Sequence, residues 1–189
     1  MLIFTSAGYN VVIVESVGLG QSEVDIDSAV DMLILLVPPG GGDSLQASKK
    51  GIMEAADLVI VNKADGSLLD SAKHTKADYS GTMQFIRQKN NDWRSKVLMI
   101  SAATGFNMEL VEQEILNFQN IMTKNQCLWT KRTTQAKHWM RDHFRRLVLS
   151  EAERNPKYPS LYAQTNKDLE LKSIPPRVAA KALFRNLNV

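Results

Sequence analysis

Four short apolar runs recur along the first 101 residues of this 189-residue chain. The runs are continuous rather than alternating, and they are rich in valine, isoleucine and leucine. Such runs are typical of strands that are buried on both faces, as in a parallel sheet. The predicted strands are residues 11–15, 32–37, 58–62 and 97–101.

Apolar residues at helical spacing lie between and after these runs. The spacing predicts one helix over residues 45–56, another within 67–88 and a third over 107–122. Strands that alternate with helices imply β-α-β units. We therefore expect an α/β fold with a doubly wound, mostly parallel sheet.

The chain changes character after Lys124. Apolar residues then recur at helical spacing with arginine and lysine on the other faces, as at Ala136, Met140, Phe144 and Leu147. A Pro-Pro pair introduces a last predicted helix over residues 178–187. We expect residues 1–124 to form the α/β domain and residues 125–189 to form a helical arm.

The composition of the chain argues against a membrane protein and against a protein built on disulfides or thiolate metal clusters. No run reaches the roughly 18 apolar residues that a membrane span needs, so we expect no membrane contact. Cys127 is the single cysteine, which excludes internal disulfides and thiolate metal clusters and fits a reducing compartment.

Charge is distributed unevenly along the chain. Residues 1–60 carry two basic and eight acidic side chains, whereas residues 128–158 carry eight basic and three acidic ones. A basic segment can bind nucleic acid, but it can also be a solvated helix face or a contact to an acidic partner. No nucleic-acid motif accompanies the charge, so we expect no nucleic-acid partner.

The tetrapeptide at residues 62–65, Asn-Lys-Ala-Asp, follows a predicted buried strand and matches N-K-x-D. The carboxylate of Asp65 can accept hydrogen bonds from the ring N–H and the exocyclic amine of guanine, which adenine cannot supply. Asn62 can bind N7 or tie the loop together, and the stem of Lys63 can lie along the base. The tetrapeptide alone is a weak signal, and a chance loop sequence is the alternative.

Ser101 and Ala102 follow the next predicted strand. Small residues there allow a backbone N–H to approach a ligand carbonyl, here guanine O6. An ordinary strand-to-loop turn explains the same dipeptide. As the next signal at a strand end after N-K-x-D, the dipeptide favours guanine recognition.

Glu15 and Gly18 follow the first predicted strand and match the D-x-x-G element of GTPases, with Glu in place of Asp. A carboxylate there can hold Mg²⁺ through water, and a glycine amide can reach a γ-phosphate. A buried strand that ends in a turn explains these residues equally well. Gln21 is a candidate to orient an attacking water, although Leu19 occupies the position where many GTPases carry that glutamine.

Three longer stretches, at residues 12–23, 42–57 and 61–66, resemble the methylmalonic aciduria type A and ArgK/MeaB family of P-loop GTPases. The resemblance covers nearly the whole chain, including an arm similar to the family's dimerisation arm. It implies a GTPase that gates the loading of adenosylcobalamin into methylmalonyl-CoA mutase and protects that enzyme. GTP or GDP and Mg²⁺ are the implied ligands.

The resemblance also implies residue roles, partners and a compartment. Glu15 would be the Mg²⁺-side carboxylate and Gly18 the γ-phosphate contact. The guanine-binding residues would be Asn62, Lys63, Asp65, Ser101 and Ala102. The implied partners are the mutase and a second copy of the chain. The compartment would be the mitochondrial matrix in a eukaryote and the cytoplasm otherwise.

The chain departs from the family at its beginning. Family members carry an upstream strand, a G-x-x-x-x-G-K-[ST] loop and a first switch, and none of these occurs in the 189 residues. We therefore expect an N-terminally truncated GTPase domain without its first strand and P-loop. That strand normally lies between the strands at 11–15 and 32–37, so its absence would leave two unpaired edges. We also expect this chain to bind GTP far more weakly than a full-length relative.

Three other functions compete with the GTPase interpretation. A binding module that keeps the partner and dimer surfaces without hydrolysis is favoured by the absent phosphate loop. A nickel-insertion GTPase is disfavoured because the chain has no Cys-x-x-Cys and no His-rich tract. Nucleic-acid binding through residues 131–157 would require a steep salt dependence of affinity.

Overall fold

The computed structural model of the chain describes residues 4, 6–16, 26–40, 50–87 and 89–187. The chain divides into two compact units, residues 1–133 and 134–189, and each is described by itself. The division falls within a helix. The expected domain boundary after Lys124 stays a prediction.

The first unit is built on a parallel sheet of three strands within the described part of the chain. The strands are β1 (Ile34–Val37), β2 (Leu58–Val61) and β3 (Lys96–Met99), in the order β1-β2-β3. Leu35 of β1 lies opposite Val59, which lies opposite Val97 of β3. Three of the four predicted strands are therefore confirmed. β1 begins two residues later and β2 ends one residue earlier than predicted, whereas β3 begins one residue earlier and ends two residues earlier.

Two helices cover one face of this sheet. They are α4 (Lys50–Ala55) and α5 (Leu69–Phe85), and a short 3-10 turn, η1 (Gly66–Leu68), precedes α5. Side chains from both helices pack on the strand residues of this face. The buried cluster is made by Leu35, Val37, Met53, Ala56, Val59, Val61, Ala64, Ala72, Tyr79 and Met83.

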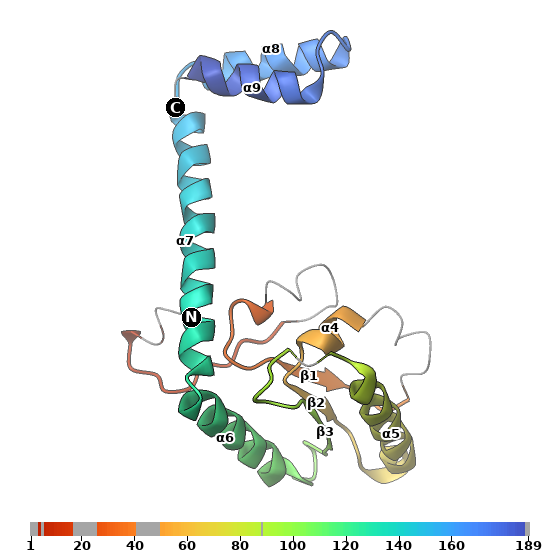
Figure 1. Ribbon diagram of the computed structural model, residues 1–189. Coiled ribbons are helices and arrows are strands. Elements are labelled where there is room, and N and C mark those ends of the chain that lie inside the picture. The colour runs from red at the N-terminus through yellow and green to blue at the C-terminus, as the bar shows by residue number, and fades with distance from the viewer. Residues whose placement is uncertain (1–3, 5, 17–25, 41–49, 88, 188–189) are drawn as a thin grey trace. The chain divides into compact units, whose positions relative to one another are not determined.

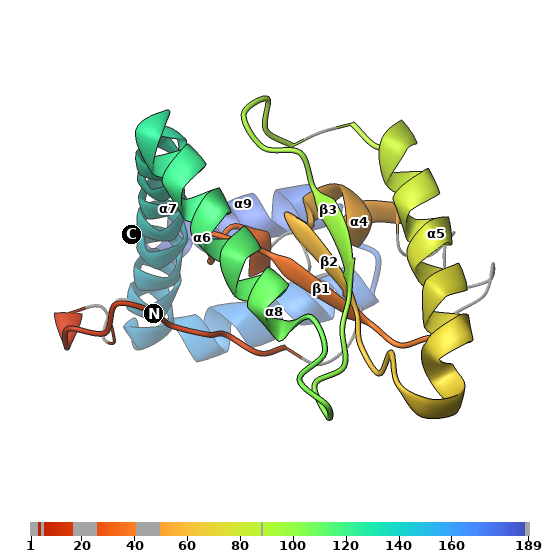
Figure 2. The same cartoon turned by 90° about the horizontal axis from the view of Figure 1, so that it is seen from below.

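The opposite face of the sheet is covered by α6 (Met108–Lys124), so the sheet lies between α5 and α6 (Figure 2). Leu58, Ile60 and Ile100 form the buried cluster on this face, and Val111 of α6 packs against it. Further along α6, Phe118 packs edge-on against Trp93, with ring centroids 5.1 Å apart. The result is the three-layer α/β arrangement expected from the sequence.

The predicted strand at residues 11–15 is wrong. Residues 11–16 form no ladder with any described residue, and Val11 and Ile13 are 77% and 89% exposed. An apolar run becomes a strand only when its backbone N–H and C=O groups have a neighbouring strand to bond. The described residues place no such neighbour beside this segment.

Three helices follow the α/β part: α7 (Cys127–Arg154), α8 (Tyr158–Glu170) and α9 (Pro176–Leu187). The first turns of α7 belong to the first unit and the rest to the second. In the second unit, the side chain of Asn155 donates a hydrogen bond of 2.9 Å to the carbonyl of Leu187, which ties the start of the α8 segment to the end of α9. α9 begins with a proline, which the first turn of a helix tolerates. None of the described helices has the length and apolar character needed to cross a membrane.

Candidate functional site

The loop after β2 is held at the carboxyl ends of all three strands. The amide of Asn62 donates to the carbonyl of Val37 at the end of β1, at 3.0 Å. The amide of Ala64 donates to the carbonyl of Ile100 after β3, at 2.9 Å. Ala64 itself is buried in the core. The N-K-x-D loop is therefore fixed at the edge where α/β sheets bind their ligands.

The side chain of Asn62 joins this loop to the loop after β3. Its Oδ1 accepts a hydrogen bond of 2.7 Å from the amide of Lys63 and one of 3.1 Å from the amide of Ala102. Ala102 lies 40 positions further along the chain. One carbonyl oxygen thus satisfies a backbone donor in each of the two loops.

Lys63 has a left-handed backbone conformation, with φ of +62°. Few residues other than glycine adopt this conformation, and such outliers collect at binding sites. The side chain is exposed. The backbone turn therefore presents a lysine stem to solvent between the fixed residues Asn62 and Ala64.

Asp65 and Ser101 connect the same two loops a second time. The hydroxyl of Ser101 donates to Oδ2 of Asp65, and it accepts a hydrogen bond of 3.2 Å from the amide of Thr104. Because a serine hydroxyl has a single proton, the bond from Thr104 leaves that proton for Asp65. Ser101 is fully buried, so the carboxylate of Asp65 is held by a fixed donor.

The loop after β3 is itself stabilised. The amide of Ser101 donates to the carbonyl of Phe106 at 3.1 Å, and the side chain of Asn107 donates to the carbonyl of Met99 at 2.9 Å. Gly105 has φ of +79°, a value that favours glycine. These contacts close residues 101–107 into a compact turn beside Asp65.

The structure describes one of the three residues that we expect beside the phosphates of the nucleotide. Glu15 is exposed at the end of the extended segment, whereas Gly18 and Gln21 lie outside the described residues. The described residues contain no group of three or more His, Cys, Asp or Glu side chains that could hold a metal ion. A single exposed carboxylate does suit Mg²⁺ that takes its other ligands from phosphate and water.

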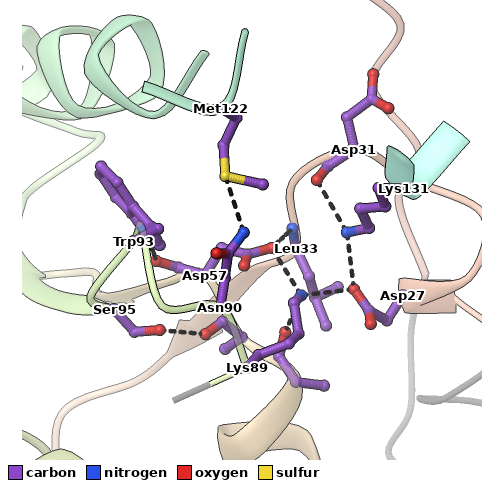
Figure 3. Close-up of polar contacts among 12 residues, drawn as sticks. Asp27, Asp31, Leu33, Asp57, Lys89, Asn90, Trp93, Ser95, Met122 and Lys131 are labelled. Atoms are coloured by element: carbon purple, nitrogen blue, oxygen red, sulfur yellow. Dashed lines mark hydrogen bonds and ion pairs between the residues drawn. The ribbon is translucent and has the colours of Figure 1, made fainter. Parts of the chain in front are cut away.

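A second polar cluster, which the sequence analysis missed, lies at the amino ends of the strands (Figure 3). Asp57, directly before β2, is 3% exposed. Its Oδ2 accepts hydrogen bonds from the amide of Leu33, at 2.9 Å, and from Nζ of Lys89, at 3.0 Å. Trp93 donates its indole N–H to the carbonyl of Asp57 at 2.8 Å. Asp57 therefore fixes the entry of β1 and the segment before β3.

The same cluster reaches the first turns of α7. Asp27 bonds Nζ of Lys89 at 2.7 Å and Nζ of Lys131 at 3.1 Å. Partial burial acts to raise the pKa of Asp27, but the hydrogen bonds and charges of the two lysines together hold it below its ordinary value. Asp31 forms a two-pronged pair with Arg132, at 3.0 and 2.6 Å. Lys131 and Arg132, in the first turns of α7, are therefore paired with acidic residues from the first part of the chain.

Comparison with known proteins finds a match to the family described as methylmalonyl Co-A mutase-associated GTPase MeaB, over residues 1–157. The methylmalonic aciduria type A homolog of Caenorhabditis elegans, named as mitochondrial, is 34% identical over 98% of the chain and 46% of its own length. The Mus musculus homolog is 38% identical over 82% of the chain and 38% of its own length. GTPase ArgK of Escherichia coli is 34% identical over 97% of the chain and 55% of its own length.

A solved structure described as a LAO/AO transport system kinase is similar over the whole chain and 60% of its own length, with a TM-score of 0.75 and 30% sequence identity. The chain thus spans about half the length of the curated relatives it matches.

Proposed function

The chain belongs to the family of methylmalonyl-CoA mutase-associated GTPases, and we propose that it binds guanine through the two joined loops after β2 and β3. The observation that carries this proposal is the pair of bridges between the loops. Asn62 bonds the amide of Ala102, and Ser101 bonds the carboxylate of Asp65. Both bridges hold polar groups at the ligand-binding edge of an α/β sheet.

Asp65 is the residue that would distinguish guanine from adenine. Its carboxylate would accept from the ring N–H and the exocyclic amine of guanine. Each carboxylate oxygen has two lone pairs, so the bond from Ser101 leaves capacity on both oxygens. Adenine has no ring N–H at that position and would leave the carboxylate unpaired, which is costly.

The other groups of the two loops would complete the base site. The stem of Lys63 would lie along the face of the base. The amide of Ala102 is engaged by Asn62, so a backbone N–H for guanine O6 would come from the next residue of the loop, Ala103. Asn62 would act by holding the two loops together.

The phosphate side of the proposal rests on the family and on Glu15, Gly18 and Gln21. Mg²⁺ bound with GTP neutralises the charge that develops on the phosphates. Glu15 would hold that ion through water, since it is an exposed carboxylate. Gly18 would offer its amide to the γ-phosphate and Gln21 would orient water. Together these residues would support hydrolysis of GTP to GDP and phosphate.

For the whole protein we propose the family's chaperone role. It would use the nucleotide state to gate adenosylcobalamin loading into methylmalonyl-CoA mutase and to protect that enzyme, acting as a homodimer through the helices of residues 125–189. The family description and the names of the relatives support this role. We propose the mitochondrial matrix as the compartment in a eukaryote, since relatives are named as mitochondrial, and the cytoplasm in a bacterium.

The alternative is a binding module that keeps the partner surface without hydrolysis. One observation favours it for these 189 residues, namely that they contain no G-x-x-x-x-G-K-[ST] loop. Phosphate release from GTP separates the two functions: a rate above the uncatalysed background supports the enzyme, and guanine binding without phosphate release supports the module.

Calorimetric titration with GDP and ADP tests the shared part of both proposals. We expect GDP to bind at least about tenfold more tightly than ADP, because only guanine pairs with Asp65. Equal affinity for the two nucleotides, or binding of neither, would contradict the proposed site.

A further inference from the structure

Asp65 is the only aspartate or asparagine in the 189 residues that is followed directly by glycine. In such a pair the backbone nitrogen of the glycine can attack the side-chain carboxyl carbon and close a five-membered succinimide ring. Glycine allows this attack most readily, because it has no side chain to hinder the approach and its backbone adopts the widest range of conformations. Asp65 therefore has a reactivity that the other aspartates of the chain share far less.

The backbone nitrogen of Gly66 is not engaged by the described part of the fold. The amides of Asn62, Lys63 and Ala64 all donate hydrogen bonds, whereas that of Gly66 has no acceptor among the described residues. Gly66 is exposed and has φ of +50°. Apart from its chain neighbours, no heavy atom lies within 4 Å of the place that a Cβ would take. No hydrogen bond to a described residue has to break before this nitrogen can turn toward Asp65.

The carboxylate of Asp65 is held at one of its two oxygens. Oδ2 accepts the hydrogen bond from the hydroxyl of Ser101, and the described residues offer no donor to Oδ1. Asp65 stands at the N-cap of η1, but its side chain makes no capping bond to that turn. The turn lies where the chain passes from β2 to α5 (Figure 1). Among the described residues, Ser101 is thus the one hydrogen-bond partner that restrains this carboxyl group.

We propose that Asp65 and Gly66 form a site of succinimide and isoaspartate formation, and that the hydrogen bond from Ser101 restrains this reaction in the folded chain. The nitrogen of Gly66 forms a bond to Cγ of Asp65 and loses its proton. The bond from Cγ to one carboxyl oxygen breaks, and that oxygen leaves as water with the amide proton and the carboxyl proton. Water then adds to either carbonyl of the ring, which restores aspartate or gives isoaspartate.

Isoaspartate would remove the geometry of the base site without changing the mass of the chain. The main chain would run through Cβ and Cγ of residue 65, so the group that accepts the bond from Ser101 would become part of the backbone. The new carboxylate would be attached directly to Cα. It would include the carbonyl oxygen that now accepts the amide of Leu68 at 3.0 Å. We therefore expect guanine recognition by residue 65 to be lost.

Bound guanine would restrain the same carboxyl group, a step that rests on the proposed function. Guanine would pair with the carboxylate of Asp65 and would add its hydrogen bonds to the one from Ser101. A chain with an empty site would therefore form isoaspartate faster than an occupied one. GDP should slow the reaction, whereas ADP, which leaves the carboxylate of Asp65 unpaired, should not.

Peptide mapping of the unmodified chain after prolonged incubation at neutral pH and physiological temperature tests the site. Trypsin cleavage after Lys63 and Lys73 releases residues 64–73, which contain both Asp65 and Asp70. Asp70 is followed by serine and is the internal reference. Fragmentation that distinguishes the two isomers should show isoaspartate at residue 65 and several-fold less at residue 70. Equal and low amounts at the two residues, in the unmodified chain and in Ser101→Ala, would overturn the proposal.

Two substitutions separate the reaction from its restraint. Ser101→Ala should raise the rate at residue 65 several-fold, whereas Ser160→Ala, in the second unit, should leave it unchanged. Asp65→Glu should abolish the signal, because glutamate would have to close a six-membered ring, which forms much more slowly. A rate in Ser101→Ala equal to that of the unmodified chain would contradict the restraint. The amount at Asp70, in the first turn of α5, identifies a variant that has unfolded.

The same incubation of the unmodified chain with GDP or ADP separates this inference from the proposed guanine site and needs no substitution. Slower formation with GDP than with ADP supports both. Equal rates with the two nucleotides, at a residue 65 that still forms isoaspartate, would contradict the guanine site and support the site of modification. Absence of isoaspartate at residue 65 from a chain that prefers GDP to ADP would overturn the inference alone.

Discussion

The hydroxyl of Ser101 donates a hydrogen bond to the carboxylate of Asp65, from the loop after β3 to the loop after β2. The two residues lie 36 positions apart in the chain. They meet because β2 and β3 are neighbouring parallel strands whose carboxyl ends share one edge of the sheet. The bond orients the carboxylate of Asp65, which we propose recognises guanine. Removing the bond should therefore weaken nucleotide binding.

Ser101→Ala should weaken GDP binding by roughly tenfold, since a hydrogen bond to a charged group contributes about 1.5 kcal/mol or more. The variant removes the donor that orients Asp65 and leaves the amide of Thr104 without its acceptor. Calorimetric titration measures the change. Ser160→Ala, in the second unit, is the control and should bind GDP like the unmodified chain. Unchanged affinity in Ser101→Ala would show that Asp65 needs no such support.

Asn62→Ala should lower the free energy of unfolding by about 1–3 kcal/mol, because the amides of Lys63 and Ala102 both lose their acceptor. Asn62→Asp keeps an oxygen at the same position and should lose less. Urea unfolding of the three proteins measures the difference. Equal losses in the two variants would mean that the two amide bonds contribute nothing specific.

Asp57→Leu should be destabilising, by about 1–3 kcal/mol, because it breaks a partly buried pair and leaves Lys89 with Asp27 as its carboxylate partner. It also removes the acceptor for the amide of Leu33. The comparison variant is Asp70→Leu, which breaks an exposed pair with Lys73 and should leave the unfolding midpoint nearly unchanged. Similar midpoints for the two variants would contradict the role assigned to the cluster.

Acid should weaken the first unit through Asp27. The pKa of Asp27 is lowered in the folded chain, so its charged form contributes stability above the unfolded value of about 3.9. That contribution is lost as the pH falls through the lower folded value. Asp27→Asn should therefore show a shallower fall in thermal midpoint below about pH 4 than the unmodified chain. The exposed Asp78→Asn is the control, and parallel curves for all three proteins would count against the pairing of Asp27 with the two lysines.

The sheet and its covering helices could be predicted because their signals are local. The runs that became β1, β2 and β3 are apolar on both faces because helices cover both faces of the sheet. The run at residues 11–15 carries the same signal, but a strand depends on its neighbour as well as on its own side chains. Pattern alone therefore could not distinguish a paired run from an exposed one.

The polar residues of the structure also differ in how far the sequence could predict them. The tetrapeptide at 62–65 and the dipeptide at 101–102 are short motifs at strand ends, so the sequence indicated both of them. The ion pair of Asp57 with Lys89 joins residues 32 positions apart and has no motif. The pairing of Asp27 with Lys131 spans 104 positions and depends on how α7 begins beside the sheet. Such contacts follow from the fold and not from the pattern of any one segment.

The most direct test of the central claim is a change of base preference in Asp65→Asn. An amide keeps an oxygen for the bond from Ser101 and for the ring N–H, but it replaces an acceptor with an NH₂ donor at the position of the exocyclic amine. That donor suits the carbonyl of xanthine and opposes the amine of guanine. Calorimetric titration of the unmodified chain and the variant with GDP and xanthosine diphosphate should therefore show GDP preferred by the first and xanthosine diphosphate by the second. Retention of the GDP preference by Asp65→Asn would contradict the assignment of Asp65 and, with it, the proposed guanine site.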